Sequence, residues 1–416
     1  MYIFRKMPNL RMSVGRRNGK LWWREMEKEV VDVEEIQSDD VIKTFELLLR
    51  RRYRLEEGPL WFVRFVTLTE GKNQERDTNF NLKYRYVCIL GFHHNVSDGT
   101  TNMKFCKVFL SVLNNLLQGK GIDYRQEGIF ALPLHDKLAE ECTSNLFLFR
   151  LFLKRFYKGI LSYGAYIRNF TWHYPMPASS DARTHVMHQE LDEVTTSKLL
   201  KRCKMEGVTL NSAFTAAANL GLYKMILRKH KLVKTHFDSV QAVNMRRYWP
   251  QDSRKDTLGC HISMLDMTVP TELEDIDNFW EYSRKVHKIL QYELIESKRA
   301  LKVQPISERL RLIICSNSWL AWAGLPSTND NHYCVTNMGD LSSTFPGTGE
   351  QVEVSRVVRS VSCHFMPTLC QHTLQTFKGR FCYSLDYYGQ KLTPEVAKEY
   401  VDELIGILKH RIHTPN

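Results

Sequence analysis

The chain has 416 residues and a formal net charge of +12, with 43% hydrophobic and 25% charged residues. This composition excludes a disordered chain, and the length fits two domains or one large two-lobed unit. The basic excess favours a polyanionic partner such as a phosphorylated cofactor, whereas no nucleic-acid-binding motif accompanies the basic clusters, so direct nucleic-acid binding is not expected.

The first third of the chain predicts two strands followed by a helix. Leu60–Thr69 is rich in β-branched and aromatic residues and predicts a strand. Residues 73–79 are polar and predict a loop, and Tyr84–His93 predicts a buried strand. Apolar residues then recur every three or four positions over 103–117, which indicates a helix that Gly119 is placed to end.

The composition of the chain changes over residues 122–182. Leu146–Phe156 is apolar but contains three basic residues, and it falls short of the 18 or so apolar residues of a membrane span. It predicts a connecting helix between two lobes; as an alternative, it suits an interfacial helix that makes peripheral contact with a membrane. Prolines and a Ser-Ser-Asp run indicate a division near 175–185, with an N-terminal lobe over 1–175 and a C-terminal lobe over 176–416.

The second half predicts further strands and helices in alternation. Thr209 and Thr393 suit helix N-caps, Pro394 suits a first helical position, and Gly207 can stop the preceding helix. The predicted strands are 187–191, 239–243, 333–336, 351–360 and 380–388, and the predicted helices are 193–204, 209–228, 273–299 and the segment that begins at 393.

The segment His93-His94-Asn95-Val96-Ser97-Asp98-Gly99 stands between the predicted strand and helix of the first third. Loops at such junctions are held by rigid elements and open to solvent. A neutral histidine accepts a proton near cellular pH, because its reference pKa is about 6.5. The aspartate can hold the turn, and the glycine lets the chain bend into a helix. The pattern predicts one imidazole as a proton-transfer group; the alternative is two scaffold histidines in a turn.

The frame HHxxxDG resembles the motif of the superfamily of CoA-dependent acyltransferases. This superfamily includes chloramphenicol acetyltransferase, alcohol acetyltransferases, plant acyltransferases of the BAHD type and nonribosomal-peptide condensation domains. Further segments resemble the family's motifs in the family's order, and the likeness is closest to alcohol acetyltransferase-like and condensation-like members. These segments are Pro8-Asn9-Leu10-Arg11-Met12 (an early strand), Gly207-Val208-Thr209-Leu210-Asn211 (the start of a helix), Val243-Asn244-Met245-Arg246-Arg247 (a strand end), Leu258-Gly259-Cys260 (a turn) and Thr336-Asn337-Met338-Gly339 (a loop).

The resemblance implies an α/β fold of two chloramphenicol acetyltransferase-like sandwich lobes with an active-site tunnel between them. It also implies that the second histidine of the motif, His94, is the catalytic base that takes a proton from the acceptor hydroxyl or amine while that group attacks a thioester. Acyl-CoA would be the co-substrate. No permanently bound cofactor and no metal are expected.

The resemblance assigns supporting roles to the neighbours of His94. Asp98 would face away from the tunnel and pair with an arginine of the second lobe. Arg246 is the candidate for that arginine and Arg247 the alternative, although both also suit a solvated strand end. His93 would be hydrogen-bonded scaffold, and Gly99 would need no catalytic role.

Asn337 and Gly339 would shape the floor or latch loop of the tunnel, although an ordinary turn is an equal alternative. The chain also departs from the family pattern. Such chains usually carry several dozen residues before the early strand, whereas Met1 stands just before it here. We therefore expect an N-terminal strand and helix of the family pattern to be missing. Met7 replaces the histidine that precedes the early proline, and the BAHD-type DFGWG motif is absent.

Two other patterns suggest a different enzyme family or a metal site. His93 and Asp98 also satisfy the HxxxxD frame of glycerolipid acyltransferases, but residues 345–349 are a poor and distant copy of the phosphate motif that those enzymes need. A second pattern suggests a zinc site, but its spacing fits no usual structural site, so a strand and a loop with ordinary core thiols are expected instead. Its residues are Cys363, His364, Cys370 and His372.

The sequence thus predicts an acyltransferase that moves an acetyl or longer acyl group from acyl-CoA to a small-molecule or lipid acceptor, an alcohol or an amine. One alternative is a condensation-like, amide-forming enzyme with a carrier-bound donor. Another is a catalytically inactive acyl- or lipid-binding protein of the same fold. Ten scattered cysteines without a CxxC pair indicate reduced thiols in an intracellular compartment, so we expect a cytoplasmic protein. We also expect a monomer.

Overall fold

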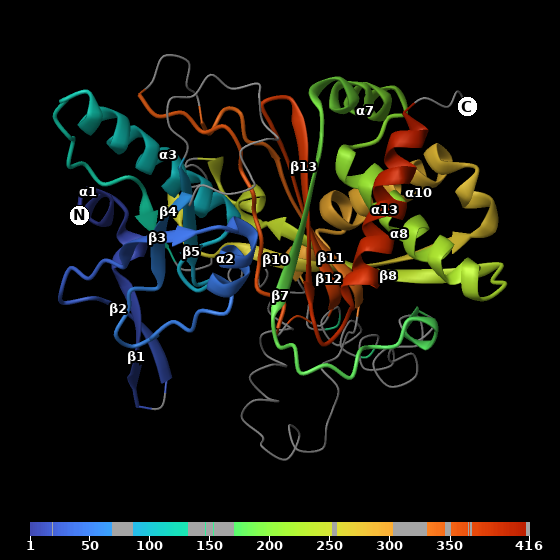
Figure 1. The fold of residues 1–416 in the computed structure, drawn as a ribbon, viewed down its shortest axis with the longest axis horizontal. Coiled ribbons are helices and arrows are strands. Elements are labelled where there is room, and N and C mark those ends of the chain that lie inside the picture. The colour runs from blue at the N-terminus through green and yellow to red at the C-terminus, as the bar shows by residue number, and fades with distance from the viewer. Residues whose placement is uncertain are drawn as a thin grey trace. The chain divides into compact units, whose positions relative to one another are not determined.

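The computed structural model describes most of the chain, and every structural statement below concerns its described residues. These are residues 1–18, 20–68, 86–131, 146, 153, 170–251, 256–302, 331–345, 351–364, 366 and 368–412. The chain divides into two compact units, and each is described on its own (Figure 1). The first unit comprises Met1–Pro133, Trp249–His261 and Ser343–Ser355, and the second comprises Leu134–Tyr248, Ile262–Ser342 and Arg356–Asn416.

The first unit is built on a three-stranded sheet of order β3-β4-β5, with β3 parallel and β5 antiparallel to β4. A separate antiparallel hairpin joins β1 to β2, and β6 pairs in parallel with β9. The elements are α1 (Tyr2–Lys6), the 3-10 helix η1 (Pro8–Arg11), β1 (Met12–Arg17), β2 (Lys20–Glu25), β3 (Val33–Ser38), α2 (Val41–Leu48), β4 (Trp61–Leu68), β5 (Val87–Phe92), α3 (Gly99–Leu117), β6 (Ile129–Phe130) and β9 (Thr257–Leu258).

The three-stranded sheet carries a helix on each face. Successive side chains of β4 alternate between the faces because a strand repeats every two residues. Phe62 and Val66 pack in one cluster with residues of α2, whereas Trp61 and Val63 pack in another with residues of α3. The strands predicted at 60–69 and 84–93, and the helix that Gly119 ends, are therefore confirmed as β4, β5 and α3.

The second unit holds a six-stranded sheet of order β10-β8-β11-β12-β13-β7. Its helices lie on one face of the sheet in Figure 1. β11 runs parallel to β8 and to β12, and the other pairs are antiparallel. The elements are β7 (Thr184–Leu191), α7 (Glu193–Met205), α8 (Leu210–Lys229), β8 (Lys234–Asn244), the 3-10 helix η3 (Met245–Tyr248), β10 (Ile262–Glu272), the 3-10 helix η4 (Leu273–Ile276), α10 (Phe279–Gln291), the π-helical turn η5 (Tyr292–Glu296), β11 (Asn331–Asp340), β12 (Thr368–Phe377), β13 (Arg380–Tyr388) and α13 (Pro394–Arg411).

Helix α8 forms the centre of the second core. It is apolar around most of its circumference and is buried along nearly its whole length, as expected for a helix covered on all sides. Thr209 caps it and Thr393 caps α13, as predicted, each accepting a hydrogen bond from the backbone three residues on. Gly221 lets α13 approach, because a Cβ there would lie 3.2 Å from the ring of Tyr400.

Three predicted elements differ from the structure. Residues 8–11 form a 3-10 helix, and the early strand begins only at Met12. The single helix predicted over 273–299 is divided into η4, α10 and η5, because Asn278, with a φ of −97° and a ψ of 45°, lies outside the helical conformation between η4 and α10, and α10 then passes into a π-helical turn. The strand predicted at 351–360 is absent among the described residues.

The segment around residue 360 is extended but unpaired for a physical reason. Its backbone groups bond to side chains instead of a neighbouring strand. The Val361 N–H donates to an Asp386 carboxylate oxygen over 3.0 Å, and the Val357 carbonyl accepts from the Gln375 amide over 2.9 Å. The hydrophobic pattern of the segment therefore reflects burial against β12 and β13 without a strand ladder.

The division of the chain also differs from the predicted one at residue 175. Residues 249–261 and 343–355 join the first unit although they come late in the sequence. Two contacts explain this: β6 pairs with β9, and the Asn114 side chain makes hydrogen bonds of 3.0 and 2.7 Å with the Val352 backbone. Long-range pairing of this kind leaves no local signal in the sequence.

Two predicted segments fall on parts that the structure does not describe. The polar segment 73–79 lies outside the described residues, as does 146–156 apart from Leu146 and Leu153, which are helical. Within the described residues, none of the helices combines the length and the apolar character needed to cross a membrane.

A buried histidine links the sheet of the second unit to its helices. The ring nitrogens of His372, on β12, lie 3.0 Å from the Tyr383 hydroxyl and 3.1 Å from the Tyr400 hydroxyl. The ring is fully buried, and burial lowers its pKa to about 3. The native state therefore holds His372 neutral at a pH where the unfolded chain would bind a proton.

We predict that this histidine makes the protein sensitive to acid. Its native pKa lies below the unfolded value of about 6.5, so stability is retained above pH 6.5 and falls with pH below it, by up to about 1.4 kcal/mol per pH unit. His372→Asn cannot ionise, so its free energy of unfolding should fall less steeply between pH 6.5 and 5, although it is lower at pH 7. Denaturant unfolding at several pH values measures this. The exposed His364→Asn is the control, and equal slopes for His372→Asn and wild type would contradict the prediction.

Candidate active site

The histidine motif forms the loop between β5 and α3, as the sequence predicts (Figure 1). The His93 N–H donates to the Leu60 carbonyl over 2.8 Å, and the Val96 N–H donates to the His93 carbonyl over 3.1 Å. Val96 is fully buried in a cluster with Leu60. The backbone of the loop is thus fixed to the residue before β4 and makes a tight turn at its centre.

Asp98 joins the start of α3 to a distant turn. Its side chain is buried. One carboxylate oxygen accepts from the Thr101 N–H over 2.9 Å and caps the helix. The other oxygen accepts from the His261 N–H over 2.8 Å. A buried carboxylate with backbone donors on both oxygens is a strong positional constraint, because charge-assisted hydrogen bonds of this kind are short and directional.

The distant turn, Leu258-Gly259-Cys260, is held to α3 by a second contact. The Thr101 hydroxyl donates to the Gly259 carbonyl over 2.9 Å and lies 3.2 Å from the Gly259 N–H. Gly259 has a φ of +121°, and a Cβ there would lie 3.2 Å from the Ala131 carbonyl oxygen. Glycine is therefore required at this position. These contacts place Cys260 beside the histidine loop.

The segment 8–12, which resembles the family's early strand, also contacts the histidine loop and the start of β4. The Asn9 side-chain amide donates to the Val96 carbonyl over 3.2 Å, and the Trp61 indole N–H donates to the Leu10 carbonyl over 3.0 Å. The resemblance marked this segment as a family feature, but only the structure shows that Asn9 contacts the motif.

His93 is half-buried and is held by its surroundings. Its Nδ1 accepts from the Asn95 N–H over 3.2 Å, and its ring meets the Tyr53 ring edge to face at 5.5 Å. Burial, and then the neighbouring His94, lower the pKa of His93. A neutral, hydrogen-bonded ring suits the predicted supporting role, which stays a prediction.

His94 is exposed, in contrast to its neighbours in the loop. Its Nδ1 lies 3.6 Å from the Cys260 sulfur. Within the described residues of its own unit, no hydrogen bond holds the other ring nitrogen, Nε2. An imidazole with one nitrogen engaged and the other open can accept a proton from a nearby group. Gly99, predicted to allow the bend, is the first residue of α3.

Two arginines that the resemblance connects with Asp98 lie at the end of β8. Arg246 is buried and Arg247 is exposed, both within η3. The backbone N–H of Arg246 donates to the Asn244 side chain over 3.0 Å. The pairing of either arginine with Asp98, and the tunnel between the lobes, stay predictions.

Asn337 and Gly339 lie on β11, where the register shifts. Gly339 has a φ of +70°, and its N–H donates to the Asn337 side-chain oxygen over 2.8 Å. The Asn337 amide lies 3.5 Å from the Asn211 side-chain oxygen, and Asn211 in turn donates to Gln241 over 3.1 Å. Two separate motifs of the resemblance thus meet in one polar cluster of the second unit.

The candidate zinc residues have other partners. His372 binds two tyrosine hydroxyls, the Cys370 thiol donates to the His332 carbonyl, and His364 contacts Ser362. Burial raises the pKa of the Cys363 thiol well above its usual value. These residues therefore act as core and loop side chains in the described part of the chain.

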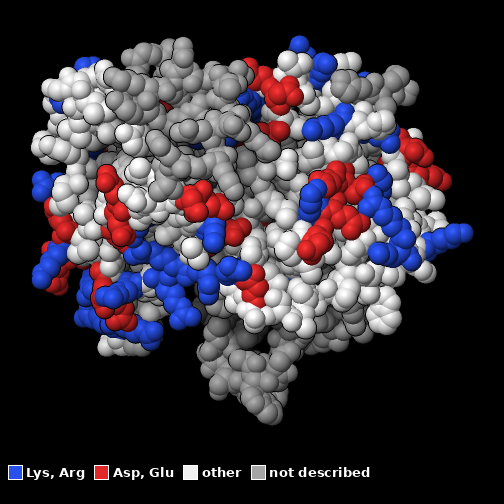
Figure 2. Space-filling view, in the orientation of Figure 1, with Lys and Arg blue, Asp and Glu red and all other residues white. Residues whose placement is uncertain are grey.

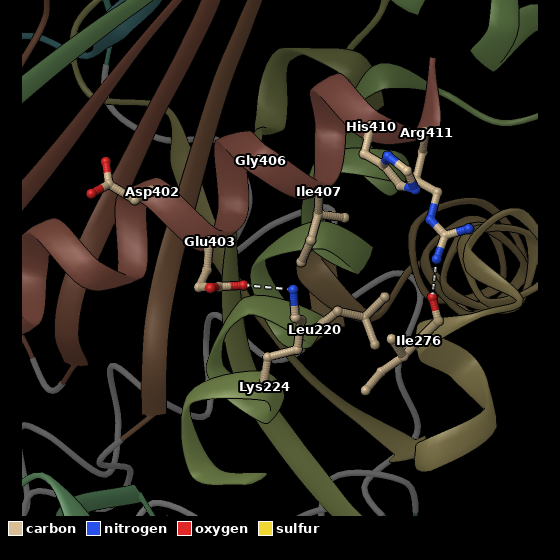
Figure 3. A pocket seen from close by; sticks show the side chains of 9 residues that line it. All are labelled: Leu220, Lys224, Ile276, Asp402, Glu403, Gly406, Ile407, His410 and Arg411. Carbon is tan, nitrogen blue, oxygen red and sulfur yellow. Dashed lines mark hydrogen bonds and ion pairs between the residues drawn. The ribbon is translucent and has the colours of Figure 1, made fainter. Parts of the chain in front are cut away.

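A cavity of about 250 Å³ lies in the helical layer of the second unit (Figure 3). The Lys224 ammonium lies 2.8 Å from a carboxylate oxygen of Glu403, and Arg411 donates to the Ile276 carbonyl. Acidic and basic groups both line the cavity, so its charge favours no ligand class. Its lining residues, none of which is a predicted site residue, are Leu220, Lys224, Ile276, Asp402, Glu403, Gly406, Ile407, His410 and Arg411.

Solved structures with similar folds share low sequence identity with this chain. The trichothecene 15-O-acetyltransferase of Fusarium sporotrichioides superposes with a TM-score of 0.68 at 13% identity, over 98% of this chain and 84% of that one. The first condensation domain of the CDA synthetase has a TM-score of 0.65 at 14% identity, over 99% and 86%. The epimerization domain from the third module of tyrocidine synthetase B has a TM-score of 0.60 at 15% identity, over 97% and 86%.

At these identities the likeness shows the fold alone, and it confirms the predicted two-lobed α/β fold class. No curated protein matches the chain in sequence. The sequence profile of the alcohol acetyltransferases matches residues 46–339, a stretch that includes the histidine loop, the turn at Cys260 and the cluster around Asn337. The chain therefore belongs to the alcohol acetyltransferase family, a family of acyltransferases.

Proposed function

We propose that this acyltransferase moves an acetyl or longer acyl group from acyl-CoA to an alcohol, with His94 as the general base. One observation carries the proposal: His94 is exposed on a rigid loop with Nδ1 beside a thiol and Nε2 open. The family supports the alcohol over the amine as acceptor. The net charge of +12 favours a donor that bears several phosphates.

In the proposed reaction, His94 Nε2 takes the proton of the acceptor hydroxyl as its oxygen attacks the thioester carbonyl carbon. The new C–O bond forms and the carbonyl electrons move to oxygen. When the C–S bond breaks, the imidazolium returns the proton to the leaving sulfur, which yields an ester and free CoA. A positioned base of this kind supplies about 10²- to 10⁴-fold in rate.

This role requires one particular tautomer of the imidazole. Nε2 can accept a proton only when the neutral ring carries its hydrogen on Nδ1. We propose that the Cys260 sulfur, 3.6 Å from Nδ1, accepts a weak hydrogen bond from that N–H, which favours the active tautomer; a thiol that donated to Nδ1 would favour the inactive one. Cys260 is then a positioning residue that acts through His94.

Other parts of the site and its setting follow from the same proposal. Asn337 and Gly339 would shape the channel that holds the substrates. Acyl-CoA enters as a co-substrate and the protein works as a monomer. The eight cysteines among the described residues are free thiols, which supports a reducing, cytoplasmic setting.

A carrier-bound donor is a second candidate, because the similar structures include condensation domains. Such a reaction uses the same base and differs in donor and acceptor. Full-length protein incubated with labelled acyl-CoA and with an acyl-loaded carrier protein, each with alcohol or amine acceptors, separates the two. Ester formation from acyl-CoA supports the main proposal, and product only from the carrier donor supports the second.

Replacing the base is the first test. His94→Ala should lower kcat by about 10²- to 10⁴-fold while the protein still binds acyl-CoA, because only the proton transfer is lost. Steady-state kinetics and donor-binding measurements check both statements. The exposed His364→Ala is the control and should match wild type. Unchanged turnover in His94→Ala would contradict the proposal, and donor binding without product from any acceptor in wild type would support a non-catalytic acyl-binding protein.

Cys260 offers a test of the tautomer. Cys260→Ala should lower kcat by about 2- to 10-fold, because a weak hydrogen bond to Nδ1 is lost. Cys260→Asn provides a stronger acceptor through its side-chain oxygen and should keep kcat near the wild-type value. Because acyl-CoA binding is not involved, the donor KM should stay constant. If both variants lose kcat equally, Cys260 acts through packing and the tautomer argument is wrong.

Replacing Asp98 tests whether kcat depends on a rigid histidine loop. Asp98→Ala removes a helix cap and the carboxylate oxygen that accepts from the His261 N–H, so it should cost about 2–4 kcal/mol and lower kcat at least tenfold at a temperature where it stays folded. Asp192→Ala removes a comparable cap from α7, with 2.8 Å to the Thr195 N–H, and should cost about 1 kcal/mol without loss of kcat. Thermal unfolding and steady-state kinetics measure the stability and kcat of both variants. A wild-type kcat in Asp98→Ala would contradict the prediction that a rigid loop is needed.

A further inference from the structure

We propose that the outer end of the β1–β2 hairpin inserts into the surface of an anionic membrane. The inserting part, called the hairpin tip, comprises Arg16, Arg17, Leu21 and Trp22. The arginines of the adjoining segment 50–54 would lie against lipid phosphates. None of these residues belongs to the histidine loop.

The hairpin tip exposes two large apolar side chains. Leu21 is 65% exposed and Trp22 is 57% exposed. As neighbours on one strand they point to opposite faces of the hairpin. Trp22 lies opposite Gly15, which has no side chain to cover it, and Leu21 lies opposite Arg16. Apolar groups on both faces of a projecting ribbon are unusual in water, because neither face then acts as a solvated side.

The inner end of the hairpin is firmly attached, so the tip is held in place. Val14 and Trp23 pack in a cluster with Leu60, and the Val14 N–H donates to the Leu55 carbonyl over 2.8 Å. The Trp23 ring meets Phe130 edge to face at 5.4 Å. The hairpin therefore presents its tip on a fixed support instead of a loose loop.

Basic side chains lie on the hairpin and on the segment beside it. Figure 2 shows Lys and Arg gathered over the hairpin and the segment beside it. Within the described residues, Arg17, Arg50 and Arg52 are exposed and have no ion-pair partner. Arg16 and Arg54 pair with Glu56 and Glu57 at 3.2 and 2.9 Å, and each of the two arginines is at least 74% exposed. The charge that remains uncompensated is positive, which favours an anionic partner.

A lipid surface fits these features better than another macromolecule. A flat protein interface covers one face of a ribbon, whereas a lipid headgroup layer surrounds both faces of an inserted tip. Trp is favoured at the membrane interface, and a leucine beside it can enter the acyl region. Exposed arginines next to such a tip attract anionic lipids. Nucleic acid would bind the arginines but would not favour an exposed leucine.

Vesicle binding by the full chain tests the proposal. We expect co-sedimentation with vesicles of phosphatidylcholine that contain roughly one-third phosphatidylserine, and much weaker binding to phosphatidylcholine alone. Leu21→Ser with Trp22→Ser should weaken binding at least about tenfold. Arg50→Glu with Arg52→Glu should also weaken it at least about tenfold, and added salt should weaken the wild type.

Matched controls lie in the second unit. Trp172→Ser removes a Trp that is 84% exposed, and Lys198→Glu with Lys201→Glu reverses two exposed charges on α7. Both should bind vesicles like wild type. All variants should keep their melting temperature and acyl transfer to a water-soluble acceptor, since none touches the histidine loop.

Three outcomes would overturn the proposal. The first is the absence of wild-type binding to anionic vesicles. The second is full binding by the variant with both apolar tip residues replaced, which would show charge attraction without insertion. The third is preferential binding of single-stranded RNA, with vesicles displaced from the same arginines.

Discussion

The carboxylate of Asp98 is the interaction on which the candidate site depends. One oxygen caps α3, and the other binds the backbone of His261, which lies 163 residues further along the chain. A buried carboxylate without such donors would cost several kcal/mol, so the charge holds two distant segments in one arrangement. His94 and Cys260 lie on the two segments that the Asp98 carboxylate connects, so the contact between them depends on the same few hydrogen bonds.

Local signals explain why part of the fold could be predicted. The strand that ends at His93, the helix that Asp98 caps and the caps at Thr209 and Thr393 all rest on patterns within one or two turns of chain. The bounds of β12 could not be predicted, because its buried residues include polar Gln371 and Gln375, which obscure the pattern of a central strand. Only their partners in the sheet make these side chains suitable for the core.

At the candidate site, too, features carried by neighbouring residues could be predicted, whereas contacts between distant residues could not. HHxxxDG is contiguous, so the position of the loop between a strand and a helix could be predicted from the sequence, and His94 could be proposed as a base. The resemblance also marked the turn at Cys260, but nothing in the chain indicated that its sulfur would lie beside His94. The contact of Asn9 with Val96 was equally invisible, since 87 residues separate the two. Pairing across such distances depends on the complete topology.

The proposed proton transfer requires that the His94 ring is neutral and carries its hydrogen on Nδ1. Selective ¹⁵N labelling of histidine, with His94→Ala used to assign the signals, reports which ring nitrogen carries the hydrogen. In the neutral ring of His94, we predict a protonated Nδ1 and an unprotonated Nε2. A ring with its hydrogen on Nε2, which cannot take a proton from an acceptor there, would contradict it.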